Sequence, residues 1–230
     1  MVESQHRVST LKLVDTLPEQ DRLEQLLEES KPRLPADCRH LHYLLATPFR
    51  YGAPYPEGSR FRRAGLTPGV FYASRTPATA VTEVAFHRLL FFADSPGTPW
   101  PDNAGEFTAF STRYRTAAAL DLAAPPLDRD RSAWTHSTDY APCQALAGAA
   151  RTAGIEVLRY ASARDERGTN IALLTCRAFG SPAPIDRQTW RIHLGQSGVR
   201  AICTFPETQL EFPRTAFATH PRIAALAWER

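Results

Sequence analysis

The chain has 230 residues, of which 43% are hydrophobic and 22% are charged. It is therefore long enough to bury a sizeable core, and its composition excludes disordered and fibrous proteins. The formal net charge is only +3, and the arginines are spread along the chain, which argues against direct nucleic-acid binding. Lysine occurs only at Lys12 and Lys31, and arginine is the better ligand for phosphate. A phosphorylated small molecule is a reasonable partner.

The four cysteines are far apart in the sequence and show no metal-ligand spacing, so we expect no metal site. The N-terminus contains no apolar stretch long enough for a signal peptide or a membrane span. We therefore expect a cytoplasmic protein that does not bind membranes and that keeps its thiols free rather than forming disulfides. The cysteines are Cys38, Cys143, Cys176 and Cys203.

Residues 18–31 are predicted to form an amphipathic helix, with Leu23, Leu26 and Leu27 on one stripe and acidic residues early. Two prolines then end the helix. We interpret residues 1–40 as a helical N-terminal extension packed on a main domain that spans residues 41–230.

The main domain begins with a predicted strand over residues 41–46, a loop rich in arginine and glycine, and a second strand over residues 69–74. Thr76 and Pro77 are a strong helix start signal. Further strands and one helix follow, with no recurring βαβ unit, so the sequence favours an α+β fold with a mostly antiparallel or split sheet. Those strands are predicted over residues 106–114, 118–122, 155–160, 169–175, 189–194, 199–205 and 208–212, and the helix over residues 141–154.

The helix that follows Thr76 carries one carboxylate, Glu83, in an apolar setting. Its main apolar stripe lies almost opposite Glu83 on a helical wheel, yet Phe86 and Leu90 share the side of Glu83. A partly desolvated carboxylate requires either an arginine partner or a role in a reaction, and spacing alone leaves both readings open.

Two further stretches are rich in polar groups. The arginines before the second strand, such as Arg50 and Arg60, lie among glycines, so this loop is either a solvated basic loop or a loop that binds an anion. Residues 160–170 offer Ser162, Arg164, Asp165 and Asn170 around a turn, either as part of a site or, more commonly for such a stretch, as a hairpin turn whose polar residues satisfy local backbone groups. A Ser/His/Asp hydrolase is disfavoured, because Ser162 has no G-x-S-x-G motif around it.

Four sequence blocks together resemble the RES domain family, which is named for a recurring arginine, glutamate and serine. They are "FRYG" at 49–52, "GSRF" at 58–61, "FYAS" and "TAVTEVAFHRLLF" within 71–91, and "RYASARDERGTNIALL" at 159–174. The order and spacing of the blocks make the resemblance much more specific than any block alone. It covers about residues 40–205.

The resemblance implies an ADP-ribosyltransferase-like fold, in which a split, mostly antiparallel sheet is flanked by helices. It also implies consumption of NAD, as a substrate rather than a cofactor, by hydrolysis or phosphorolysis. The residues that match the motif of the family are expected to do the chemistry: Arg50, Glu83 and Ser162. Those expected to bind NAD are Arg50, Tyr51, Arg60, Tyr72 and Asn170.

The implied chemistry agrees with the residues. Loss of nicotinamide makes the ribose cationic, and Glu83 in a low-dielectric pocket would stabilise that charge. Ser162 would be an orienting hydrogen-bond donor rather than a nucleophile, since no base is evident beside it. The resemblance further implies the toxin of a toxin–antitoxin pair, a homodimer silenced by a helix-turn-helix antitoxin. A protein-modifying ADP-ribosyltransferase and a catalytically inert binding module remain as alternatives.

Overall fold

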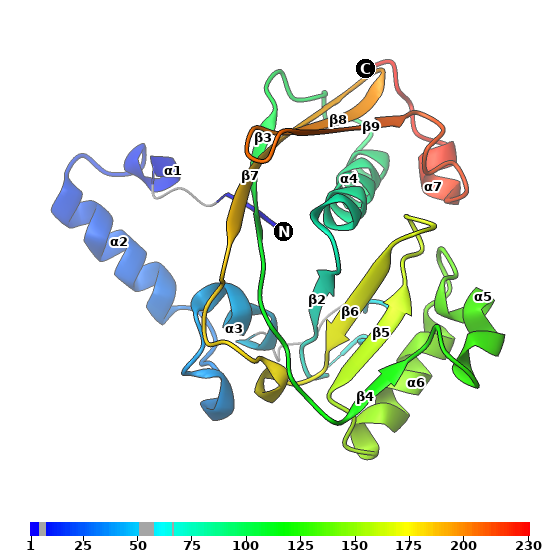
Figure 1. Cartoon of the computed structure of the whole chain (residues 1–230). Helices are drawn as coiled ribbons and strands as arrows, with labels where there is room; N and C mark the ends of the chain where they lie inside the picture. The colour runs from blue at the N-terminus through cyan, green and yellow to red at the C-terminus, as the bar shows by residue number, and fades with distance from the viewer. Residues whose placement is uncertain (5–7, 51–57, 66) are drawn as a thin grey trace.

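Two β-sheets form the framework of this computed structural model, which describes residues 1–4, 8–50, 58–65 and 67–230. Sheet A has the strand order β1-β3-β7-β8-β9, and sheet B has the order β2-β6-β5-β4. All neighbouring strands are antiparallel except β4 and β5. The predicted α+β fold with a split, mostly antiparallel sheet is confirmed. The helices flank the two sheets (Figure 1).

The elements follow the chain order shown in Figure 1. The strands are β1 (Val2–Glu3), β2 (Phe71–Ser74), β3 (Gly105–Phe110), β4 (Ala119–Asp121), β5 (Val157–Ala161), β6 (Thr169–Leu173), β7 (Arg187–Gly195), β8 (Gly198–Cys203) and β9 (Thr208–Pro213). The helices are α1 (Val8–Leu11), α2 (Leu17–Glu29), α3 (Tyr43–Arg50), α4 (Pro77–Asp94), α5 (Arg131–Trp134), α6 (Ala141–Thr152) and α7 (Pro221–Ala224). Within the described ranges, no helix is both long enough and apolar enough to cross a membrane.

Helix α4 begins where the sequence predicts. Thr76 is its N-cap and accepts a hydrogen bond from the Thr79 amide, and Pro77 occupies the first turn. The main apolar stripe packs in one core with the inner face of sheet A. Phe86, on the other side of the helix, is 1% exposed and packs edge-on against Phe217 near α7. The helix therefore has two buried apolar faces, as predicted.

Sheet B separates two further cores because its side chains alternate between faces. Tyr160 and Ala172 pack with Phe61 and with α5 and α6 on one face. Phe71 and Leu173 pack with α3 on the other face. The face that carries Tyr160 also carries Ser74 and Asn170, because these three residues are register partners across β2, β6 and β5.

The predicted strand over residues 41–46 is wrong, because the chain forms helix α3 there. Leu45, Ala46 and Phe49 are buried at helical spacing. A short apolar run fits a buried helix as well as a strand, and here packing against sheet B decides.

The N-terminal extension contacts the rest of the chain at its first strand and at Cys38. Strand β1 pairs with β3 and extends the edge of sheet A. Helix α2 forms with a capping box between Thr16 and Glu19, but Leu26 and Leu27 are 46% and 42% exposed. The leucine stripe of α2 is thus largely open to solvent rather than packed on the main domain.

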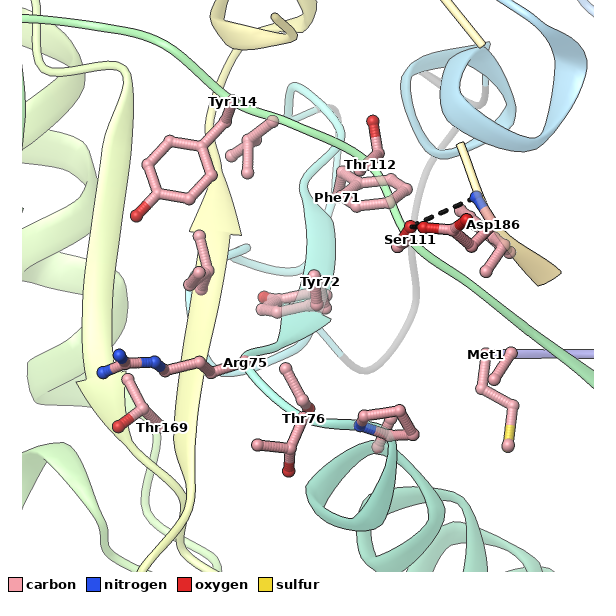
Figure 2. A pocket seen from close by; sticks show the side chains of 18 of the residues that line it. Met1, Phe71, Tyr72, Arg75, Thr76, Ser111, Thr112, Tyr114, Thr169 and Asp186 are labelled. Atoms are coloured by element: carbon pink, nitrogen blue, oxygen red, sulfur yellow. Dashed lines mark hydrogen bonds between the residues drawn. The ribbon is translucent and has the colours of Figure 1, made fainter. Parts of the chain in front are cut away.

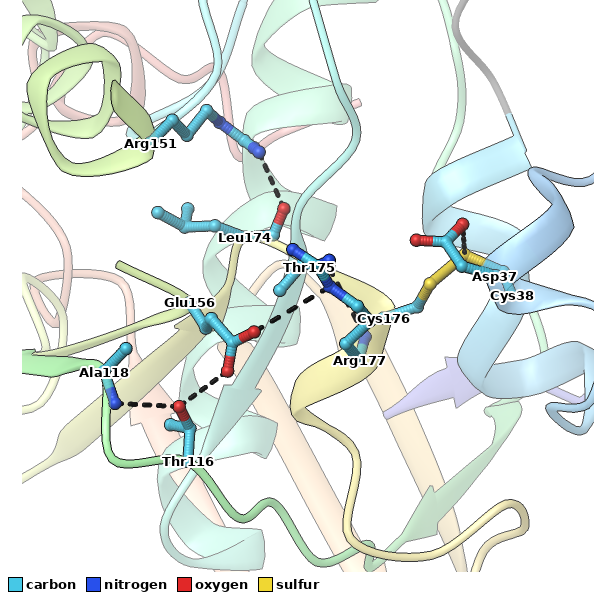
Figure 3. A network of polar contacts seen from close by, with 10 residues as sticks. All are labelled: Asp37, Cys38, Thr116, Ala118, Arg151, Glu156, Leu174, Thr175, Cys176 and Arg177. Atoms are coloured by element: carbon cyan, nitrogen blue, oxygen red, sulfur yellow. Dashed lines mark hydrogen bonds and ion pairs between the residues drawn. A yellow bond between two sulfur atoms is a disulfide. The ribbon is translucent and has the colours of Figure 1, made fainter. Parts of the chain in front are cut away.

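The expectation of four free thiols is also wrong. Cys38 and Cys176 form a disulfide that links the short turn before α3 to the turn after β6 (Figure 3). Cys143 and Cys203 are free and buried. The pairing cannot be inferred from spacing, since 138 residues separate the two positions and only the packed turns bring them together.

A thiol titration tests this disulfide. In denaturant without reductant we expect two reactive thiols, from Cys143 and Cys203, and a peptide map that links the peptides of Cys38 and Cys176. Reduction should lower the free energy of unfolding by on the order of 4 kcal/mol, because a long loop is released in the unfolded chain. Four reactive thiols before reduction would contradict the bond.

The contact between α2 and α3 gives a pH prediction. A carboxylate oxygen of Glu28 lies 2.6 Å from Nη2 of Arg50, and hydrogen bonds from Arg50 and then Lys31 lower the Glu28 pKa to about 2. Since the folded-state pKa is lowered, this contact stabilises the fold above the ordinary value of 4.5 and is lost as the pH falls towards 2. Glu28 is largely exposed, so salt should weaken the effect.

Carboxyl NMR measures this directly. Glu28 should titrate near pH 2, and Arg50→Gln should move the midpoint towards the ordinary value. Lys31→Gln is the matched control and should move it less. A wild-type midpoint at the ordinary glutamate value would show that the ion pair does not form in solution.

Candidate active site

Glu83 lies in the second turn of α4 and meets sheet B near the β5–β6 hairpin. Its Oε1 accepts hydrogen bonds from Ser162 Oγ at 2.7 Å and from Asn170 Nδ2 at 2.6 Å. Ser162 and Asn170 are 6% and 4% exposed, whereas Glu83 is half-buried. Three residues from two sequence regions thus meet at one carboxylate oxygen.

The hydroxyl of Ser162 can donate in only one direction. Its Oγ accepts the backbone N–H groups of Arg164 and Asp165, both at 3.1 Å. A serine hydroxyl has one proton and two lone pairs, so the proton goes to Glu83. The turn between β5 and β6 is therefore both the predicted hairpin turn and a part of the Glu83 cluster.

The same turn is tied to the start of α4. The hydroxyl of Thr79 donates to a carboxylate oxygen of Asp165 at 2.7 Å. Gly168 is needed at this contact, because a Cβ there would lie 2.6 Å from Thr79 and 2.7 Å from Asp165. These contacts fix the position of Ser162 relative to the helix that carries Glu83.

Asn170 is oriented by a second relay. Ser74 Oγ donates to Asn170 Oδ1 at 2.7 Å, and Ser74 and Asn170 are register partners on β2 and β6. With its oxygen occupied, the amide presents its NH₂ group to Glu83. Ser74 and Thr79 were not predicted from sequence, because a single polar residue at the end of a strand or the start of a helix carries no distinctive signal.

Tyr72 holds the "GSRF" segment. Its hydroxyl accepts the Phe61 N–H at 2.9 Å and lies 2.8 Å from Ser59 Oγ. The ring is 38% exposed. Tyr160, beside Asn170 in the sheet, is fully buried, and burial first, with the nearby Tyr72 and Glu83, raises its pKa well above the usual value.

The predicted arginines lie in two different places. Arg60 donates to the carbonyl oxygens of Trp134 and His136, at 2.7 and 3.0 Å, and its guanidinium lies 4.7 Å from the centre of the Tyr140 ring. Arg50 ends α3 and forms the ion pair with Glu28. Tyr51 lies outside the residues that the structure describes.

A cavity of about 690 Å³ lies beside β2 (Figure 2). Its floor is apolar and its rim is polar, as in small-molecule sites. Tyr72 and Ser74 also border the cavity, but their side chains lie on the other face of sheet B, and Glu83, Ser162 and Asn170 do not belong to its lining. Its apolar floor includes Phe71, Ala73, Phe110, Ile171 and Leu173.

The disfavoured hydrolase finds no support in these contacts. Ser162 donates to Glu83, and His136 Nδ1 accepts the backbone N–H of Asp139 at 2.8 Å. Among the described residues, the one group with metal-ligand proximity is Asp37, Cys38 and Cys176. Its two sulfur atoms are bonded to each other, so they are not available as thiolate ligands.

Replacing Ser162 tests the support of Glu83. Ser162→Ala should lower the free energy of unfolding by about 1–3 kcal/mol, because a hydrogen bond to a charged group is lost and two backbone N–H groups lose their acceptor. Urea denaturation measures this change, with exposed Ser132→Ala as the matched control. Equal stability of the two variants would contradict the described network.

The family model of the RES domain matches residues 33–195, which is more than half of the chain. No curated protein matches the chain significantly. The match includes the arginine segments, α4 and the β5–β6 hairpin, and the α+β architecture is consistent with an ADP-ribosyltransferase-like fold. The chain therefore belongs to the RES domain family.

Proposed function

We propose that the protein cleaves the nicotinamide–ribose bond of NAD. One observation carries the proposal: Glu83 is held by two neutral donors, Ser162 and Asn170, and no cation among the described residues forms an ion pair with it. A carboxylate already neutralised by arginine would be a structural ion pair. The negative charge of Glu83 is instead left to act on a ligand. Membership of the RES domain family supports the choice of NAD.

The geometry suggests how Glu83 acts. Both hydrogen bonds reach Oε1, and within the described part of the chain no donor to Oε2 is found. When the bond between the ribose and nicotinamide breaks, its electron pair leaves with the nicotinamide nitrogen and positive charge develops on the ribose. Oε2 would face that charge or bind a ribose hydroxyl. Ser162 and Asn170 would keep the carboxylate in place while the charge develops.

The other predicted residues have narrower roles in this proposal. Tyr72 would pack its partly exposed ring against the nicotinamide, and Arg60 would contribute positive charge for the phosphates. Arg50 forms an ion pair with Glu28, so the substrate would compete with Glu28 for its guanidinium. The acceptor of the ADP-ribosyl group would be water or inorganic phosphate. Transfer to a protein remains the alternative.

The biological setting is proposed from the family alone. The chain would be the toxin of a toxin–antitoxin pair, would form a homodimer and would be silenced by a helix-turn-helix antitoxin. Coexpression with the product of a neighbouring gene for a small DNA-binding protein would test this setting, because a true antitoxin should copurify and suppress NAD consumption.

The substitution Glu83→Gln tests the proposed function. It keeps the shape and hydrogen-bonding capacity of the side chain but removes the charge, so NAD turnover should fall by about 100-fold or more. Nicotinamide release by purified protein gives the rate, and circular dichroism checks the fold. Glu166→Gln, at an exposed position of the β5–β6 turn, is the matched control and should keep its activity. An unchanged rate in Glu83→Gln would refute the assignment.

A further inference from the structure

A second arginine, Arg164, lies near Glu83. Arg164 follows Ser162 in the β5–β6 turn, and its backbone N–H donates to Ser162 Oγ. Its Nη2 donates to the Ser137 carbonyl oxygen at 2.9 Å, and its guanidinium lies 3.7 Å from the centre of the Phe86 ring. The side chain is therefore held in one place by the turn, by α4 and by the segment before α6.

Arg60 and Arg164 are positioned by the same short segment. Arg60 contacts the carbonyl oxygens of Trp134 and His136, and Arg164 contacts that of Ser137. Both guanidinium groups therefore reach the same stretch of backbone, residues 134–137. Burial lowers the pKa of Arg164, the charge of Arg60 lowers it further, and Tyr140 and Glu83 oppose these effects. The fold thus places two like charges near each other, which is unfavourable unless an anion joins them.

Neither guanidinium has a carboxylate partner within 4.0 Å among the described residues. Elsewhere in the chain arginines do pair closely: Arg191 lies 2.6 Å from Glu106 and Arg222 lies 2.8 Å from Asp94. Partly buried cations are costly without a counter-ion. The nearby negative charge of Glu83 raises the pKa of Arg164 but forms no ion pair with it.

Both arginines also keep hydrogen-bond donors for a ligand. A guanidinium has five N–H groups, and the carbonyl contacts use two in Arg60 and one in Arg164. Two guanidinium groups held in fixed positions can donate paired hydrogen bonds to the oxygens of a phosphate.

We propose that Arg60 and Arg164 together bind a phosphate group next to Glu83. The phosphate belongs either to the diphosphate of the dinucleotide or to inorganic phosphate that accepts the ADP-ribosyl group. The identity of these two ligands rests on the proposed function. The anion site itself rests only on the two arginines and their contacts. In the phosphorolytic case, a phosphate oxygen forms a bond to the anomeric carbon as nicotinamide leaves with the electron pair of the broken bond.

Calorimetry tests the anion site without turnover. Wild-type protein is titrated with inorganic phosphate, with ADP-ribose and, for comparison, with nicotinamide, which has no phosphate. Arg164→Gln should weaken the binding of at least one phosphate ligand by about 10-fold or more and leave nicotinamide unchanged. Exposed Arg167→Gln, in the same turn, removes the same charge and should bind like wild type. Arg164→Lys keeps the charge but loses the forked guanidinium, so its affinity for the phosphate ligand should lie between the affinities of Arg164→Gln and Arg167→Gln.

Steady-state kinetics then separates the two sources of phosphate. A raised KM for inorganic phosphate with an unchanged KM for NAD in Arg164→Gln assigns the site to the acceptor, and the reverse result assigns it to the diphosphate. The proposal is overturned if wild-type protein binds neither phosphate ligand, or if Arg164→Gln and Arg167→Gln bind them equally. Absence of NAD turnover together with arginine-dependent phosphate binding would refute the proposed function and leave the anion site standing.

Discussion

The site depends on one carboxylate oxygen that is held from two sides. Oε1 of Glu83 accepts hydrogen bonds from Ser162 and Asn170, and each of these donors is in turn oriented by its own partners. Backbone N–H groups occupy the lone pairs of the serine, and Ser74 occupies the oxygen of the asparagine. Neither donor can turn away without leaving a buried polar group unsatisfied, which would cost free energy. The carboxylate is therefore positioned before any ligand arrives, as electrostatic catalysis requires.

The two-sheet architecture brings these groups together. Helix α4 packs one face against sheet A and starts beside the β5–β6 hairpin of sheet B. Glu83, in the second turn of this helix, can therefore contact the hairpin. The strand register of sheet B places Ser74, Asn170 and Tyr160 in one row. The cavity beside β2 lies over the opposite face of the sheet, which carries Phe71 and Leu173 (Figure 2).

The sequence predicted those elements whose start or burial depends on neighbouring residues along the chain. Thr76 and Pro77 identify the start of α4, and the doubly apolar pattern around Glu83 correctly indicates a helix buried on two sides.

Features that depend on tertiary contacts were not predicted. The run that forms α3 has no periodicity long enough to separate helix from strand. The Cys38–Cys176 disulfide and the ion pair of Arg50 with Glu28 join residues whose proximity only the folded chain reveals. Sequence motifs identified Glu83, Ser162 and Asn170, but the groups that orient them and the contacts of Arg164 are seen only in the folded chain.

The central claim is that the ribose of NAD loses its base next to Glu83, and a crystal structure with an NAD analogue that resists cleavage tests it most directly. The account predicts that the anomeric carbon of the nicotinamide ribose contacts the Glu83 carboxylate while Ser162 and Asn170 keep their hydrogen bonds to Oε1. An analogue bound with its nicotinamide ribose remote from Glu83, or a Glu83 side chain turned away to solvent in the complex, would contradict it.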